Sequence, residues 1–498
     1  MQNQILIQYF HWYYNEEENL WTKVAKEAAH LKELGVTMAW LPPAYKGSAG
    51  GFSVGYDAYD LFDLGEFDQK GTTETKYGSK EQFLKAIEAL HEQGIGVLAD
   101  AVFNHKAAGD ELEKFFVRRV DENDRTKFIS DPFEIEAWTK FIFPGRGDTY
   151  SNFKWDFKCF SGVDWANDIQ EKGIFSIQNE VGNGFEEVPS DEMGNYDYLM
   201  FNDIDFRNRA VVEELKCWGE WLINTTGIDG FRLDAVKHIS PGFIKEWIAH
   251  LNAKFDRKFF IVAENWDVVN SVQQETYMQQ TEGETQLFDT LLHRRFYLAG
   301  KQGKEFDLSS ILNNTLMSIR PELAVTFVDN HDSQPLQSLE SYVDFWFRPI
   351  AYAIILLRQQ GIPCLFFPDL YGAIYDDKSK AGEDTHIQLA MLPEVEIMSR
   401  LRAQLAYGEQ RDYFNHKNCI GWTRAGDDEH EHSGLAVVAS NGDDGFKTME
   451  IGKRHGGKIF VDALKHRQDE VVIDQNGNGG FPCNAGSVSV WVLKDGLD

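Results

Sequence analysis

Residues 79–105, SKEQFLKAIEALHEQGIGVLADAVFNH, combine a helix signal with a strand signal. Ser79 is a favoured N-cap residue, and apolar side chains recur at helical spacing from there to Gly94. Residues 95–103 are an apolar run that is typical of a buried strand. A helix followed at once by such a strand is part of a βαβ unit, so this stretch indicates a parallel sheet.

The same alternation continues on both sides of this stretch. Further helices are predicted at 20–34, 209–225, 241–255 and 349–360. Strands are predicted at 5–10, 36–41, 95–103, 230–233, 259–263, 286–288, 324–328 and 363–367. This number of strands is that of a closed (β/α)8 barrel, so we expect an α/β fold of the TIM-barrel type.

Two parts of the chain do not follow the barrel pattern. Residues 106–207 lack a long helical period and are too long for a loop, which predicts a small domain inserted after the third strand. After residue 398, short β runs separated by Gly, Asn and Asp predict a C-terminal antiparallel β-sandwich. The predicted order is barrel 1–105, inserted domain 106–207, barrel 208–398 and sandwich 399–498.

Composition and charge exclude several classes of protein. Hydrophobic residues make up 43% and charged residues 26%, so the chain is not disordered, collagen-like or a coiled coil. Lys and Arg number 49 against 79 Asp and Glu, a net charge of −30. Such a surface repels nucleic acids and anionic membranes, and no run of about 20 apolar residues is present. A neutral substrate or a cation is the more natural partner.

The cysteines indicate a reducing compartment. Their number is odd and their spacing is wide, without a CxxC motif, which predicts free thiols and neither a disulfide framework nor a zinc site. The first 14 residues lack the basic region and cleavage site of a signal peptide. We therefore expect a cytoplasmic protein. The five cysteines are Cys159, Cys217, Cys364, Cys419 and Cys483.

Ionisable residues follow four of the predicted strands. The active sites of (β/α)8 barrels lie at the C-terminal ends of the strands, so these residues are expected to meet on one rim. No Gly-rich phosphate loop opens a helix, so a nucleotide site is not supported. The residues that follow or end these strands are Asn104, His105, Arg232, Asp234, Lys237, His238, Glu264, Trp266, Asp329, His331 and Asp332.

Carboxylates grouped with aromatic residues suggest glycoside hydrolysis. That reaction needs one carboxylate at the anomeric carbon and one carboxylic acid that protonates the leaving oxygen. Arg232 faces the same side of its strand as Asp234 and should keep that carboxylate ionised. Glu264 stands between apolar residues and Trp266, a setting that raises the pKa of a carboxylic acid.

The same residues carry a family resemblance. DAVFNH (100–105), GFRLDAVKH (230–238), AENW (263–266) and FVDNHD (327–332) resemble, in this order, the four sequence regions of the α-amylase family, glycoside hydrolase family 13. GYDAYDLFDLGEFDQKG (55–71), GNYDYLMFNDIDFRN (194–208) and GSVSVWV (486–492) resemble the bacterial liquefying and intracellular α-amylases. The resemblance covers nearly the whole chain.

The resemblance implies a role for each matching residue. Asp234 would be the nucleophile, Glu264 the acid/base and Asp332 the transition-state stabiliser. His105 and His331 would hydrogen-bond the sugar at the cleavage point. Trp12, Trp155 and Trp165 are each interpreted as packing residues. The full set of implied substrate-binding residues is Tyr56, His105, Tyr196, Arg232, Lys237, His238, Trp266 and His331.

The resemblance also implies a Ca²⁺ ion between the inserted domain and the barrel. Its ligands would be Asn104, Asp197, Asp203 and the carbonyl of His238, which supply the oxygens that calcium prefers. A second group, Asp164, Asp205 and Glu186, has a Glu (186 or 187) where the liquefying enzymes have an Asp. A further C-terminal site is disfavoured, because Asn415 stands where a carboxylate is usual.

The function implied is endo-acting, retaining hydrolysis of α-1,4-glucosidic bonds in starch, glycogen and maltooligosaccharides. The expected partner is an α-glucan polysaccharide or oligosaccharide, and the protein is expected to be a monomer. An exo-acting maltooligosaccharide-forming enzyme or a transglycosylase would use the same carboxylates. A non-catalytic glucan-binding protein is the alternative of another class, and the presence of all three carboxylates disfavours it.

Overall fold

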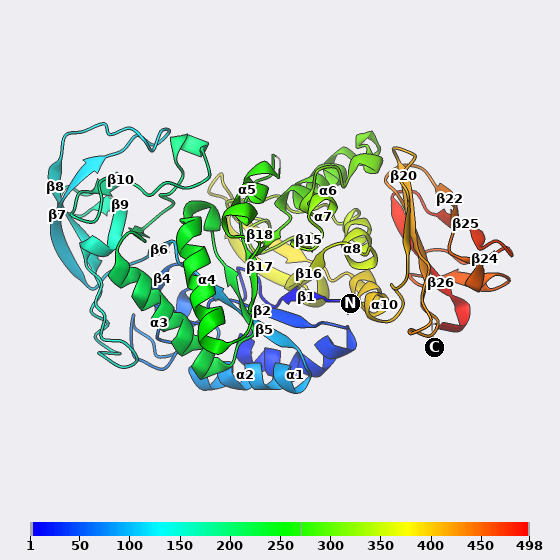
Figure 1. The fold of residues 1–498 in the computed structure, drawn as a ribbon, viewed down its shortest axis with the longest axis horizontal. Coiled ribbons are helices and arrows are strands. Elements are labelled where there is room, and N and C mark those ends of the chain that lie inside the picture. The colour runs from blue at the N-terminus through cyan, green and yellow to red at the C-terminus, as the bar shows by residue number, and fades with distance from the viewer. Residues whose placement is uncertain (1–2, 270, 497–498) are drawn as a thin grey trace.

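The computed structural model describes residues 3–269 and 271–496, and within them the predicted barrel is confirmed. The parallel strands close in the order β1-β16-β15-β14-β13-β12-β5-β2, at the centre of the molecule (Figure 1). Each strand overlaps one predicted from the sequence. Their bounds are β1 Leu6–Gln8, β2 Met38–Leu41, β5 Gly96–Ala101, β12 Gly230–Leu233, β13 Phe260–Ala263, β14 Gln286–Phe288, β15 Ala324–Phe327 and β16 Ile362–Phe366.

Helices surround the barrel, and some of them begin at a residue whose side chain caps the first turn. Ser79 accepts a hydrogen bond from the backbone of Gln82, whose side chain in turn accepts one from the Ser79 backbone, so α2 starts with a capping box. None of the helices in the described residues is long and apolar enough to span a membrane. The bounds are α1 Leu20–Glu33, α2 Lys80–Glu92, α3 Arg209–Thr226, α4 Pro241–Phe255, α5 Val272–Gln280, α6 Thr290–Gln302, α7 Leu316–Ile319, α8 Arg348–Leu357, α9 Phe367–Tyr371 and α10 Pro393–Gln404.

The chain between β5 and α3 forms an antiparallel sheet at one end of the molecule, in the order β6-β11-β9-β10-β7-β8 (Figure 1). Only Val102, Phe103 and Asn104 separate β5 from β6, so this sheet starts at the barrel rim. The boundaries 106 and 207 of the inserted domain remain predictions. The strands are β6 His105–Lys106, β7 Glu111–Arg119, β8 Phe133–Lys140, β9 Phe160–Ala166, β10 Glu171–Ile177 and β11 Asn202–Ile204.

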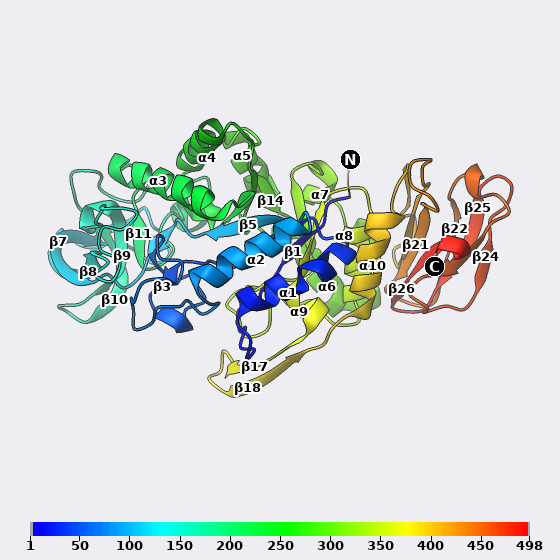
Figure 2. The ribbon, with the colours of Figure 1, turned by 90° about the horizontal axis from the view of Figure 1, so that it is seen from below.

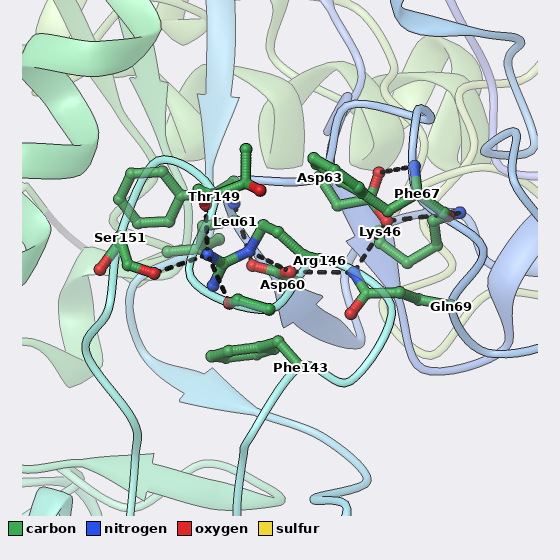
Figure 3. Close-up of polar contacts among 12 residues, drawn as sticks. Lys46, Asp60, Leu61, Asp63, Phe67, Gln69, Phe143, Arg146, Thr149 and Ser151 are labelled. Carbon is green, nitrogen blue, oxygen red and sulfur yellow. Dashed lines mark hydrogen bonds and ion pairs between the residues drawn. The ribbon is translucent and has the colours of Figure 1, made fainter.

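A buried charge network joins a loop of this insert to the barrel side (Figure 3). Arg146 Nε donates to Asp60 Oδ2 at 2.7 Å, and its Nη1 donates to the carbonyls of Thr149 and Ser151 at 2.6 and 2.8 Å. Gln69 Nε2 bridges Asp60 and Asp63, at 2.9 Å from each. Because every contact is a hydrogen bond to a charged or carbonyl group, burial of these charges is compensated.

The C-terminal chain forms the sheet β19-β20-β21-β26-β23-β24, against which the pair β22-β25 packs at the other end of the molecule (Figure 1). Leu435 and Val437 of β21 join the core of the barrel, whereas Ala436 and Val438 join a core with Phe481 of β25. Alternate residues of one strand thus fill two cores, as expected of a sandwich. The strands are β19 Gln410–Tyr413, β20 Cys419–Arg424, β21 Leu435–Ser440, β22 Gly445–Glu450, β23 Ile459–Asp462, β24 Glu470–Val472, β25 Asn478–Cys483 and β26 Ser487–Leu493.

Two hairpins complete the described elements. β17 (Ala373–Lys378) and β18 (Asp384–Leu389) pair antiparallel and project away from the barrel (Figure 2). β3 (Lys46–Gly47) pairs with β4 (Ala58–Asp60), which carries Asp60 of the buried network. The sequence analysis did not predict either hairpin.

Candidate active site

Arg232 of β12 lies at the centre of the carboxyl rim and holds two predicted catalytic carboxyl groups. Its Nη1 lies 2.6 Å from Asp234 Oδ1, and its Nη2 lies 2.5 Å from Glu264 Oε2. Asp100 of the neighbouring β5 stands opposite Arg232 in register and binds it at 3.0 Å. The guanidinium is fully buried, so its orientation is set by these carboxyl groups.

Asp100 belongs to the predicted rim cluster after the third strand, but no role was predicted for it. Its Oδ2 accepts hydrogen bonds from Trp40 Nε1 at 2.9 Å and Tyr56 OH at 2.8 Å. The signal was in the DAVFNH motif, where Asp100 is a charged residue within an apolar strand run. A charge at such a position needs a buried partner, and Arg232 is that partner.

Burial controls the electrostatics of the three carboxyl groups. Burial raises the pKa of Asp234 to about 6, although Arg232 lowers it. Desolvation thus outweighs the guanidinium, yet a carboxyl group with a pKa of about 6 is still mostly ionised at pH 7. Burial also raises the pKa of Glu264, and burial together with the nearby Glu264 raises that of Asp332 well above its usual range. Carboxyl groups this close retain a proton at higher pH than free ones.

A wall of stacked rings borders the carboxyl groups. The Tyr56 and His331 ring centroids are 4.9 Å apart at 14°, and the Trp12 ring stacks on Tyr56 at 5.7 Å and 6°. His105 Nε2 lies 2.8 Å from the Tyr56 carbonyl, and His331 Nε2 lies 3.4 Å from Asp332 Oδ2. Trp12 was interpreted as a packing residue, but its ring is part of this wall.

The remaining predicted substrate residues meet where the insert contacts the barrel. His238, at the end of the short helix Val236–His238, packs its ring edge-on against Tyr196 at 4.4 Å, with its Nδ1 2.6 Å from the Tyr196 carbonyl. Lys237 Nζ lies 2.8 Å from Glu192 Oε1 and 3.2 Å from the Trp266 carbonyl. Burial lowers the pKa of His238 to about 4, so its imidazole is neutral at pH 7.

The predicted calcium ligands Asn104, Asp197 and Asp203 are all buried. Asn104 Nδ2 lies 3.4 Å from Asp203 Oδ1, while Asn104 Oδ1 is buried without a hydrogen-bond partner. Burial and the neighbouring Asp197 raise the pKa of Asp203 well above its usual range. An unpaired amide oxygen beside acidic groups that destabilise one another fits a hard cation.

Carboxylates alone do not complete a metal site. In the described part of the chain, no three His, Cys, Asp or Glu side chains are arranged to hold a metal ion. A cation here would depend on the Asn104 oxygen and on backbone carbonyls, as calcium sites commonly do. For the second predicted group, Asp205 already pairs with Arg207 at 2.8 Å, and Glu186, whose pKa burial raises to about 7, accepts from the Phe206 backbone.

A cavity of about 380 Å³ in the insert was not anticipated. Lys106, Trp138, Asp164, Trp165 and Phe201 contribute to its lining. Trp138 and Trp165 are 42% and 38% exposed, and Trp165, interpreted from the sequence as a packing residue, contributes to this lining. Strand alternation was the available signal for Trp138, because its neighbours Ala137 and Thr139 are buried on the other face of β8.

Fold and site together define a (β/α)8-barrel enzyme with paired carboxyl groups of the glycoside-hydrolase kind. The family model of the alpha amylase catalytic domain matches residues 20–392. The chain therefore belongs to the α-amylase family.

Relatives and solved structures agree with this assignment. The chain is 50% identical to a cytoplasmic alpha-amylase of Escherichia coli (strain K12), over 99% of this chain and 100% of that protein. It is 47% identical to an alpha-amylase of Geobacillus stearothermophilus, over 99% of this chain and 87% of that protein. A solved structure of a variant of alpha-amylase I from Eisenia fetida with maltohexaose matches with a TM-score of 0.65 at 14% identity, covering 99% of this chain and 98% of that one, which supports the fold.

Proposed function

We propose that this α-amylase cleaves internal α-1,4-glucosidic bonds of starch, glycogen and maltooligosaccharides with retention of configuration. The observation that carries the proposal is the Arg232 guanidinium, which binds Asp234 through one nitrogen and Glu264 through the other. Retaining enzymes act by a double displacement, in which the two carboxyl groups are about 5–5.5 Å apart. Binding of both carboxyl groups by one guanidinium supports such a short spacing.

We assign the three carboxyl groups the roles that the family resemblance implies. Asp234, oriented by Arg232, attacks the anomeric carbon and forms a glycosyl-enzyme ester. Glu264 gives its proton to the leaving oxygen and then takes one from the water that hydrolyses the ester. Asp332, next to His331, stabilises the positive charge that develops on the sugar ring. Tyr56 and His331 present the stacked wall to that ring.

The cavity beside Lys106 supports endo-action. Exposed indole rings suit the faces of sugar rings, and Trp138 and Trp165 stand on the insert at the end of the rim that carries His105. A glucan chain bound there would extend beyond the cleavage point. A transglycosylase or an exo-acting enzyme would use the same carboxyl groups, so the products distinguish these activities.

Two measurements test the proposal. Asp234→Asn should retain the fold and lose several orders of magnitude in kcat, because the amide cannot act as the nucleophile. Chromatography of products from soluble starch over time should show random internal cuts. Near-normal activity of Asp234→Asn, steady release of one short product from the start, or products longer than the substrate would each reject the proposal.

We also propose Ca²⁺ as the ion between the insert and the barrel, held by Asn104, Asp197, Asp203 and the His238 carbonyl. The ion would be structural, since none of these residues is among the three reacting carboxyl groups. The C-terminal position remains disfavoured, because Lys447 Nζ donates a hydrogen bond to Asn415 Oδ1 and an ammonium group opposes a cation there.

A cytoplasmic, monomeric protein is the remaining part of the proposal. Within the described residues all five cysteines are free. Thiol titration of the denatured, unreduced protein should therefore find five thiols, and sedimentation should give the monomer mass. Recovery of fewer than two thiols, or a larger sedimenting species, would contradict these expectations.

A further inference from the structure

Two of the five cysteines meet in the C-terminal sheets, at the opposite end of the molecule from the insert (Figure 1). Cys419 begins β20 and Cys483 ends β25, so they lie on different sheets of the sandwich. Both sulfur atoms lie beside Gly445 of β22. A Cβ at that glycine would stand 2.6 Å from Cys483 Sγ and 2.9 Å from Cys419 Sγ, so the missing side chain leaves room for two adjacent thiols.

The surroundings make the two thiols unequal. The adjacent Cys483 thiol, the Phe446 N–H and the Lys447 ammonium each favour a negative charge on the Cys419 sulfur. These contacts lower the pKa of Cys419 to about 7. The neighbouring Cys419, together with burial, raises the pKa of Cys483. The pair thus holds one thiol suited to attack and one that stays protonated.

The sulfur with the lower pKa, that of Cys419, is also the more accessible of the two. Cys419 lines a cavity of about 220 Å³ together with Lys304, His416 and Ser440. Cys483 is fully buried. A small reagent that enters this cavity therefore reaches Cys419 first, with Cys483 adjacent to the product of that reaction.

We propose that Cys419 and Cys483 form a redox-active pair that is oxidised by small-molecule disulfides such as glutathione disulfide. The Cys419 thiolate attacks one sulfur of the disulfide, forms a mixed disulfide and releases a thiolate, which takes a proton from water. Cys483 then gives its proton to water and attacks Cys419 Sγ, which releases the second small thiol. Two protein thiols are oxidised, one small disulfide becomes two thiols, and the new bond ties β20 to β25 across the sandwich.

The test uses the native full-length chain and glutathione disulfide. After exposure, free thiols are blocked with N-ethylmaleimide, and the denatured protein is digested without reduction for peptide mass spectrometry. We expect linked peptides containing Cys419 and Cys483, lighter by two hydrogens than the separate peptides, and their release by dithiothreitol. The proposal is overturned if both residues carry maleimide, or if glutathione remains on Cys419 without the internal bond.

Matched variants separate the two steps. Cys483→Ser should stop the reaction at glutathione-modified Cys419, because the second thiol is missing. Cys419→Ser should leave Cys483 unmodified, since that sulfur is buried. Cys217, an exposed thiol on α3, serves as the comparison: Cys217→Ser should leave the 419–483 bond unchanged. Modification of Cys483 in Cys419→Ser at the wild-type rate would refute the order of attack.

Discussion

At the residue scale, two opposed effects set the pKa of Asp234. Burial raises its pKa to about 6, and Arg232 prevents a further rise. The nucleophile must be ionised, so kcat/KM for a maltooligosaccharide should fall by about tenfold per pH unit below pH 6. Arg232→Lys should move this acid limb to higher pH, because a single ammonium cannot hold both Asp234 and Glu264. A pH–rate profile measures both effects.

The control is Arg209→Lys, since the exposed Arg209 of α3 binds Glu213 of the same helix and Glu246 of α4. That variant should keep the wild-type profile. A rate that stays level down to pH 4 in the wild type would show that the titration of Asp234 does not limit the reaction.

At the element scale, the loop that carries Arg146 is attached to β4 through Asp60 (Figure 3). Arg146 is 3% exposed, so Arg146→Ala leaves the buried Asp60 carboxylate without its cationic partner and should reduce the free energy of unfolding by about 3–5 kcal/mol. Lys154→Ala, which removes an exposed pair with Asp148 beside the same loop, should cost at most about 1 kcal/mol. Urea denaturation measures the free energy of unfolding of both variants. Equal losses would show that the buried Arg146–Asp60 pair contributes no more stability than the exposed pair.

The proposed Ca²⁺ belongs to the same scale, because its ligands would join the insert to the barrel. A ligand that binds only the native state stabilises it by mass action, so chelation should lower the Tm. Asp203→Asn should weaken that response. Metal analysis that finds no calcium in active protein, with an unchanged Tm after chelation, would exclude the ion from this position.

At the scale of the whole molecule, the barrel and the C-terminal sheet share one core. Trp422 of β20 is fully buried, donates from Nε1 to the Leu357 carbonyl of α8 at 3.3 Å, and belongs to the barrel's core together with Val437. Truncation after residue 398 would expose the apolar face of α8, so we expect that fragment to aggregate. Gel filtration of the soluble fraction checks this, and a monodisperse, active 1–398 fragment would contradict it.

The sequence by itself determined the barrel and the rim at which the predicted polar residues meet. The periods of its apolar residues are local, and the polar residues that end the strands must reach one rim whenever the strands are parallel. Each predicted barrel strand was therefore confirmed, and Asp234, Glu264 and Arg232 were named before any contact was known. The strands of the insert were not predicted one by one, although β8 carries a clear alternation of buried and exposed residues.

Only the tertiary structure decided which charges and rings share an environment. Asp100 binds Arg232 across strand register, Trp12 stacks on Tyr56, and Arg146 reaches Asp60 from 86 positions away. The raised pKa of Asp234 and the meeting of Cys419 with Cys483 likewise depend on burial and on contacts between distant segments. These properties arise from desolvation and proximity in space, and the order of residues along a chain does not encode either one locally.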